Sequence, residues 1–330
     1  MLSRILSSYQ GKRILVTGGG GYLGTNLIAL LGSIDCQIIR LDKISSRIAH
    51  KNIKAKIIDI TADIRQNEIW GNTLKDVDII FHFAAQTSVY IANKNPTEDY
   101  KINILPMLQL LETCRQKRWQ PAILFAGTVT ETGIPTCLPV DESHPDKPIT
   151  IYDLHKLMAE NYLKYYANQG IVKGAILRLA NVYGPGPKSS SADRGVLNIM
   201  IKKALKGENL TLYGKGNYLR DYIFIEDVAR AFLIAGSNIE CLNGQHFVIG
   251  SGKGHTLAEA FTLVAQQVNQ KTGKHIQIKS IEPPTPQSPI EARNFVADSK
   301  RFSKLTGWNP TRSLSEGIDG TIQASWEELD

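Results

Sequence analysis

The 330-residue sequence predicts an α/β fold built on a doubly wound parallel sheet, and three observations indicate it. Short apolar runs alternate with longer segments of helical period through the first half of the chain. Each run is apolar nearly throughout, as strands buried on both faces of a parallel sheet should be. The first run ends in a cluster of glycines, TGGGGYLG at residues 17–24, which opens the next apolar segment.

The strands and helices are expected in a regular succession. The apolar runs that predict strands lie at residues 13–18, 37–42, 55–60, 77–85, 122–127 and 174–184. The segments between them that predict helices lie at residues 23–31, 99–117 and 152–168. Helices that connect successive strands in this way cover both faces of the sheet, so the succession predicts a Rossmann-type arrangement.

The composition changes after residue 180. A segment rich in Gly, Pro and Ser, YGPGPKSSSADRG, precedes a mixture of short helices and strands, with a proline cluster at 283–289. We expect a first domain at residues 1–180 and, at 181–330, a smaller mixed α/β C-terminal substrate subdomain. The boundary is expected to be discontinuous, with some segments returning to the first domain.

Composition and charge exclude several classes of protein. The formal net charge is +7, but Lys and Arg are dispersed, which favours a small anionic substrate over nucleic acid. No apolar run reaches the roughly 18 residues of a membrane span, and the N-terminus lacks a secretory signal. We therefore expect no membrane partner and a cytoplasmic location. The four cysteines have no metal-ligand spacing, so no metal is expected.

The glycine cluster predicts a phosphate-binding turn. Gly18, Gly21 and Gly24 follow the first strand in the spacing G-x-x-G-x-x-G and open a helix. Glycines permit the tight turn and a close backbone approach, and the helix N-terminus attracts a pyrophosphate. An ordinary glycine-rich turn is the alternative for this motif taken alone.

Asp42 ends the second strand and strengthens that interpretation. A carboxylate at this position accepts the hydroxyls of an adenosine ribose and repels a 2′-phosphate. It favours NAD over NADP, although Arg40 and Lys43 are cations nearby. An N-cap or a solvated loop acid is the alternative for Asp42.

A tyrosine and a lysine predict the catalytic centre. Tyr152 and Lys156 are four residues apart on an expected helix, so both side chains lie on one face. A nearby ammonium stabilises the phenolate and makes the tyrosine a general base near neutral pH. This spacing is common in surface pairs, but its combination with the glycine turn and Asp42 favours catalysis.

With these motifs, the chain resembles the extended short-chain dehydrogenase/reductase family, in its NAD-dependent nucleotide-sugar epimerase/dehydratase branch. The resemblance runs nearly from end to end. The motifs that carry it, in the family's order, are TGGGGYLG, HFAA at 82–85, Asn103, Tyr152 with Lys156, LRLANVYGPG, RDYIFIEDVARA at 220–231 and ADSKRFSKLTGWNP.

The resemblance implies a role for each matching residue. Catalysis would fall to Thr128, Tyr152, Lys156 and Asn103. NAD would be bound by Gly18, Gly21, Tyr22, Leu23, Gly24, Asp42, Asp59, Ile60, Phe83, Ala84, Ala85, Tyr152 and Lys156. The nucleotide-sugar substrate would be bound by Thr128, Asn181, Asn198, Arg220 and Arg293.

Departures from the family's pattern narrow the chemistry. The family's dehydratases carry Asp-Glu where this chain has Val129 and Thr130, and its decarboxylases carry Glu at the position of Thr130. Both chemistries are disfavoured because their proton carriers are missing. Glu131 is expected to point to the opposite face of a strand, and Thr132 replaces a tyrosine on the substrate side.

Two further residues raise hypotheses. Pro106 lies in the expected helix that carries Asn103, and the resulting kink is proposed to help Asn103 hold an active-site water; a tolerated kink is the alternative. His155 precedes Lys156 and is expected to point away from Tyr152, which favours a packing role.

The expected function is an NAD-dependent nucleotide-sugar 4-epimerase that oxidises C4 of an NDP-hexose transiently. An NDP-4-keto-sugar reductase or another NDP-sugar oxidoreductase is the nearest alternative, and a non-catalytic NAD-sensing regulator is the alternative of another class. The resemblance also implies a homodimer through the helices at 99–117 and 152–168. The base and the sugar stay open.

Overall fold

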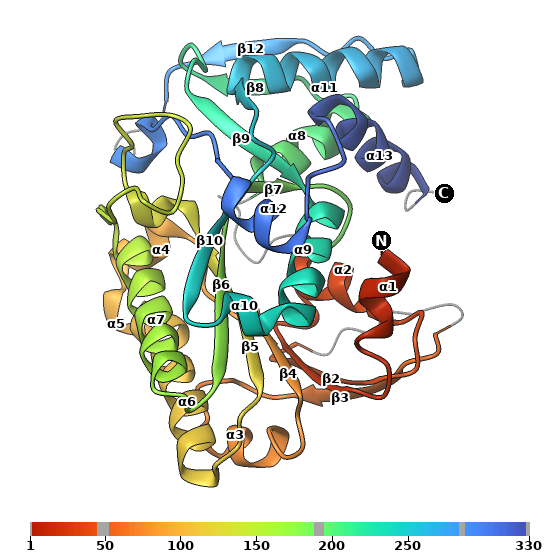
Figure 1. The fold of residues 1–330 in the computed structure, drawn as a ribbon. Coiled ribbons are helices and arrows are strands. Elements are labelled where there is room, and N and C mark those ends of the chain that lie inside the picture. The colour runs from red at the N-terminus through yellow and green to blue at the C-terminus, as the bar shows by residue number, and fades with distance from the viewer. Residues whose placement is uncertain (1, 45–52, 188–194, 284–287, 328–330) are drawn as a thin grey trace.

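The computed structural model describes residues 2–44, 53–187, 195–283 and 288–327. Figure 1 shows a larger body around one sheet, with a smaller subdomain above it. Parts of the Gly/Pro/Ser-rich segment at 183–195 and of the proline cluster at 283–289 lie outside the described residues.

The large sheet has seven strands, all paired in parallel, in the order β10-β6-β5-β4-β1-β2-β3. These are β1 (Arg13–Thr17), β2 (Gln37–Asp42), β3 (Lys56–Thr61), β4 (Ile79–His82), β5 (Ala122–Thr128), β6 (Lys173–Leu179) and β10 (Gln245–Ile249). The predicted Rossmann-type sheet is confirmed. The strand order reverses between β1 and β4, and in sheets of this kind the ligand crevice lies at this switch point, at the carboxyl ends of the strands.

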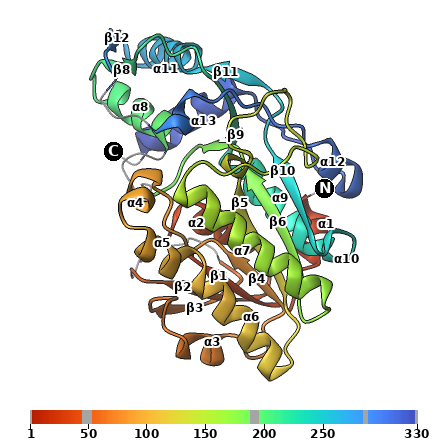
Figure 2. The ribbon, with the colours of Figure 1, turned by 90° about the vertical axis from the view of Figure 1, so that its left-hand side faces the viewer.

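Helices cover both faces of the sheet (Figures 1 and 2). One face carries α1 (Leu2–Ser7), α2 (Tyr22–Leu31), α9 (Ile225–Ser237) and α10 (Ile239–Leu242). The other carries α3 (Glu68–Thr73), α4 (Val89–Lys94), α5 (Pro96–Asn103), α6 (Leu105–Lys117) and α7 (Ile151–Asn168). Along β1, Ile14 and Val16 enter the core beneath α2 and α9, whereas Leu15 enters the core beneath α6 and α7. Burial on both faces explains the continuous apolar runs.

The smaller subdomain has its own core between short sheets and three helices. Its strands are β7 (Asn181–Tyr183), β8 (Leu210–Tyr213), β9 (Leu219–Phe224), β11 (Gly254–Thr256) and β12 (Ile278–Ile281). Its helices are α8 (Val196–Leu205), α11 (Leu257–Thr272) and α13 (Leu314–Glu327), and α12 (Lys300–Thr306) packs against β10 of the large sheet instead. Residues beyond 180 therefore supply β10, α9 and α12 to the larger body.

Two expected elements are each divided in the structure. The helix expected at 99–117 is α5 and α6, which meet at Ile104. Pro106 lies in the first turn of α6, where a missing N–H costs no hydrogen bond, so this proline begins a helix rather than kinking one. The strand expected at 174–184 is β6 and β7, which belong to different sheets.

Candidate active site

The glycine turn joins β1 to α2 at the crevice. Gly18 has a φ of +66°, and a Cβ there would lie 2.7 Å from the backbone nitrogen of Ala84. A Cβ on Gly24 would lie 2.4 Å from the carbonyl oxygen of Gly18. Gly21 caps α2 without a side-chain hydrogen bond, so nothing from its own residue covers the helix N-terminus. This cradle fits a pyrophosphate, which requires close backbone and open N–H groups.

Asp42 lies beside the turn, at the end of β2. Its Oδ2 accepts a hydrogen bond from the Gly20 N–H at 3.0 Å. Arg40, a candidate for binding a 2′-phosphate, is buried instead, and its Nε donates to Asp59 Oδ1 at 2.5 Å. The arrangement leaves a carboxylate next to the phosphate turn, as NAD requires.

The end of β4 forms the facing side of the crevice. Thr17 Oγ1 accepts from the backbone N–H groups of Phe83 and Ala84, at 3.2 Å each. The Phe83 ring packs edge-on against Phe232, with centroids 4.7 Å apart. Ala84 and Ile60 pack against the core on the α6 and α7 side, and Leu23 packs on the other face. Apart from Tyr152 and Lys156 of α7, the predicted cofactor residues therefore lie at the carboxyl ends of β1, β2, β3 and β4 or just after them.

Thr128 ends β5 and begins the short 3₁₀ helix η1 (Val129–Thr132). Its hydroxyl lies 2.9 Å from the hydroxyl of Thr130. The expectation that Glu131 points to the opposite face of a strand is wrong, because the strand has already turned into η1. Glu131 Oε1 instead accepts the Thr128 N–H at 3.1 Å. The sequence could have predicted this contact, since Thr128 and Glu131 form the T-x-x-E pattern that is typical of a capping box.

Tyr152 and Lys156 lie on the first turns of α7, which Thr150 caps by accepting the Asp153 N–H. Both side chains are buried, and α7 packs against β5 and η1. The Lys156 ammonium lies 3.8 Å above the centre of the Phe125 ring. Burial lowers the pKa of Lys156 to about 8, an effect opposed by Glu131, Asp99 and Glu160.

Asn103 holds the loop that follows β4. Its Oδ1 accepts the Gln86 N–H at 3.1 Å, and its Nδ2 donates to the Gln86 carbonyl at 2.9 Å and to Asp99 at 3.0 Å. Both amide atoms thus bind the loop or Asp99 of α5, and the hypothesis that Asn103 also holds a water stays a prediction. Asp99 also meets His155 Nδ1 at 2.7 Å. His155 thus joins α7 to α5 through a buried polar contact and does more than pack.

The substrate side brings two arginines together. Arg220 on β9 is buried and donates to the carbonyl of Arg293, while Arg293 donates to the Ile290 carbonyl at 2.9 Å. Asn181 opens β7, and its buried Oδ1 has no hydrogen-bond partner among the described residues. Such groups suit an anionic, hydrogen-bonding ligand.

Asn198 and Tyr22 meet each other rather than pointing separately at a ligand. Asn198 Nδ2 donates to the Tyr22 hydroxyl at 3.1 Å, and Asn198 Oδ1 accepts the Gly184 N–H at 3.0 Å. The Tyr22 hydroxyl donates to the Gly184 carbonyl at 2.8 Å. The side chain of Asn198 therefore links α8 to the first residue of α2, and the substrate contact expected at this position stays a prediction.

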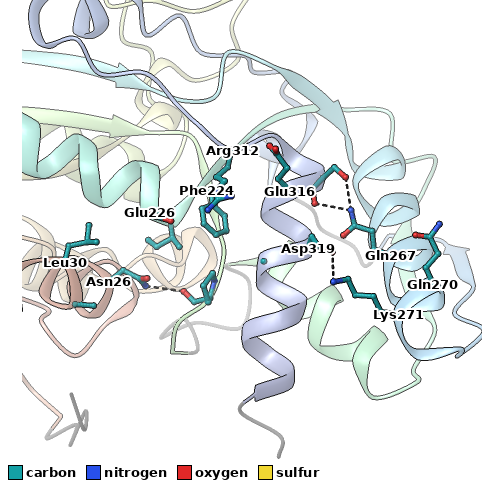
Figure 3. A pocket seen from close by; sticks show the side chains of 15 residues that line it. Asn26, Leu30, Phe224, Glu226, Gln267, Gln270, Lys271, Arg312, Glu316 and Asp319 are labelled. Atoms are coloured by element: carbon teal, nitrogen blue, oxygen red, sulfur yellow. Dashed lines mark hydrogen bonds and ion pairs between the residues drawn. The ribbon is translucent and has the colours of Figure 1, made fainter. Parts of the chain in front are cut away.

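A separate pocket of about 670 Å³ lies at the junction of the two subdomains, and Figure 3 shows the side chains that line it. It is lined from α2, α9, α11 and α13 and is bordered by the Lys271–Asp319 ion pair at 2.7 Å. None of the predicted site residues lines it. The candidate active site is therefore the crevice at the strand ends. Within the described ranges, no group of three His, Cys, Asp or Glu side chains is placed to hold a metal ion.

Comparison with known proteins places this site in a family. Residues 14–250 match the NAD dependent epimerase/dehydratase family. The chain belongs to this family. It is therefore an NAD-dependent enzyme.

Individual relatives cover nearly the whole chain. The structure of a Thermotoga maritima UDP-glucose 4-epimerase with UDP-glucose superposes with a TM-score of 0.83 at 30% identity, covering 96% of this chain and 100% of that one. A Mycolicibacterium smegmatis UDP-glucose 4-epimerase is 29% identical over 94% of this chain and 97% of its own. A Danio rerio UDP-glucuronic acid decarboxylase 1 is 27% identical over 99% of this chain and 76% of its own.

Proposed function

We propose that this enzyme is a UDP-hexose 4-epimerase. The observation that carries the proposal is the buried Tyr152 and Lys156 pair on α7, which packs against the strand end that bears Thr128. Most of the named relatives above are UDP-glucose 4-epimerases. Thr130, which stands where the family's decarboxylases carry Glu, disfavours the chemistry of the zebrafish relative.

Each residue of the candidate active site has its own role in the proposed reaction at the sugar. The chemistry that bound NAD would supply is removal of hydride from C4 and its return to the opposite face of the 4-keto sugar, which has to turn over between the two transfers for C4 to be inverted. Tyr152 takes the proton of the 4-hydroxyl and gives it back when the hydride returns. Lys156 stabilises the phenolate through its positive charge, and Thr128 orients the reacting oxygen by a hydrogen bond. Arg220, helped by Arg293 and Asn181, would bind the diphosphate.

The epimerase and its alternatives make different predictions for turnover. An epimerase interconverts UDP-glucose and UDP-galactose without added cofactor and without a net absorbance change at 340 nm. A 4-ketoreductase consumes reduced cofactor at every turnover, and Asp42 argues against the NADPH that such enzymes usually need.

Substitution of Tyr152 tests catalysis itself. We expect Tyr152→Phe to lower kcat by about 10²- to 10⁴-fold, because the general base is lost while the ring is kept. Tyr165→Phe on the same helix is the matched control, since Tyr165 is exposed. If Tyr152→Phe interconverted the two sugars as fast as the unaltered enzyme, catalysis by this tyrosine would be refuted and the NAD-sensing alternative favoured.

We further propose a homodimer through the outer faces of α6 and α7, which run side by side in Figure 2. Leu154, Met158 and Tyr165 share one face of α7 and are 40%, 38% and 61% exposed. Apolar side chains exposed in a row on one helix are typical of an interface.

A cytoplasmic location stays a prediction. The described helices include none that is long and apolar enough to cross a membrane.

A further inference from the structure

We propose that Glu131 is a positioning residue of the active site, which holds Thr128 in the orientation that acts on the sugar oxygen. The inference rests on the function proposed above. Glu131 is fully buried, and in this proposal it acts through Thr128.

Two sets of hydrogen bonds within one turn restrain Thr128. Glu131 Oε1 accepts the Thr128 N–H at 3.1 Å, and Thr128 Oγ1 accepts the Thr130 N–H at 3.3 Å. These reciprocal contacts form a capping box. Because the second contact also brings the two threonine hydroxyls within 2.9 Å, the box fixes both the backbone and the hydroxyl of Thr128.

The Glu131 carboxyl is itself anchored to the sheet. Its Oε2 lies 3.0 Å from Nε of Arg178 on β6, and both residues are almost wholly buried. Arg178 also binds Glu160 of α7 and Asp146. Arg178 lies on β6, and its other two partners come from α7 and from the loop before α7. A shift of the Glu131 carboxyl would therefore disturb the whole cluster around Arg178.

An uncharged side chain at position 131 can make the same contact with the Thr128 N–H. Three carboxyl groups, those of Glu131, Glu160 and Asp146, surround the single guanidinium of Arg178. Burial, followed by the neighbouring Glu160, raises the pKa of Glu131 well above its usual value. A protonated carboxyl still accepts the Thr128 N–H through Oε1, so glutamine is the matched substitute.

The test compares two substitutions at residue 131. Glu131→Leu keeps the bulk but removes the acceptor, and we expect it to lower kcat about 10-fold with KM changed less than about 3-fold. Glu131→Gln should restore most of that loss. In a Thr128→Ala background, Glu131→Leu should cost no further kcat, because two residues that act as one unit are not additive.

Asp146→Asn is the control, since it alters the same arginine cluster without touching Thr128. We expect it to lower the melting temperature but not kcat. A second measurement does not depend on turnover. Amide hydrogen exchange at Thr128 should be faster in Glu131→Leu than in Glu131→Gln, relative to residues earlier in β5.

Two results would overturn the proposal. One is a Glu131→Leu enzyme with unchanged kcat and unchanged exchange at Thr128; the other is an equal loss of kcat with and without the Thr128 hydroxyl. If the unaltered enzyme fails to interconvert UDP-hexoses, the proposed function is at fault, and the exchange measurement still decides the contact.

Discussion

Lys156 combines a catalytic charge with a cost to stability. Its ammonium is buried, which lowers the pKa to about 8, below the roughly 10.4 expected in an unfolded chain. Between these values the unfolded chain binds a proton that the folded chain has released. The free energy of unfolding contributed by this residue therefore rises with pH across that window and is smallest below pH 8.

This conflict predicts opposite effects of Lys156→Met on stability and on rate. We expect the free energy of unfolding at pH 7 to rise by about 1–3 kcal/mol, because a buried charge is removed, and kcat to fall at least about 100-fold. Denaturant titration of the cofactor-free protein at pH 7 and pH 9.5 measures the first effect. A variant less stable than the unaltered protein at pH 7 would show that the carboxylates around Lys156 outweigh its burial.

Asp42 is expected to set cofactor choice. We predict that Asp42→Ala weakens NAD binding about 10-fold or more and raises the NADP/NAD preference, since the ribose and the Gly20 N–H both lose an acceptor. Calorimetry on the cofactor-free protein measures both constants. Asp35→Ala, which removes an exposed acid before the same strand, should leave them unchanged.

The sequence predicted best the placement of residues that is set by spacing along one element. Tyr152 and Lys156 share a helix face whatever the rest of the fold does. Glu131 was misplaced because a strand was assumed to continue past Thr128, and its true contact depends on where β5 ends. The side-chain contact between Asn198 and Tyr22 was not predicted for a similar reason, since the two residues are distant in the chain.

Among the secondary-structure elements, the buried parallel strands were predictable because a strand buried on both faces has a continuous apolar run in the sequence. β10 was not predicted, because its run HFVI is short and lies among the mixed elements of the second half. The division of the helix at 99–117 was also missed. A proline such as Pro106 looks the same in the sequence whether it kinks one helix or begins another. Only tertiary packing decides which of the two structures forms.

The proposed dimer can be tested at the outer face of α7. We expect the paired change of Met158→Glu and Tyr165→Glu to convert the proposed dimer to a monomer, because charges on an apolar interface must be desolvated. Light scattering after size-exclusion chromatography measures the mass. Exposed Ile281 of β12 lies on the other subdomain, and Ile281→Glu is the control. A dimer that survives the paired change must use another surface.

At the scale of the whole molecule, Tyr22 couples the two subdomains. Its hydroxyl joins the start of α2 to Gly184 and to Asn198 of α8. We expect Tyr22→Phe to raise KM for the UDP-hexose about 3- to 10-fold while NAD stays bound, since one bridging hydroxyl is removed. Initial rates and cofactor content measure the two effects. Tyr213→Phe, at an exposed site of the smaller subdomain, should change neither, and equal changes in both variants would refute the coupling.

The late arrival of β10 has a consequence during synthesis. Residues 245–249 complete the edge of the large sheet beside β6, whose own residues end at 179. While a ribosome makes the intervening segment, the edge of β6 carries unpaired backbone groups that can pair with another nascent chain. We therefore expect chains that terminate between these two strands to aggregate more readily than the full chain.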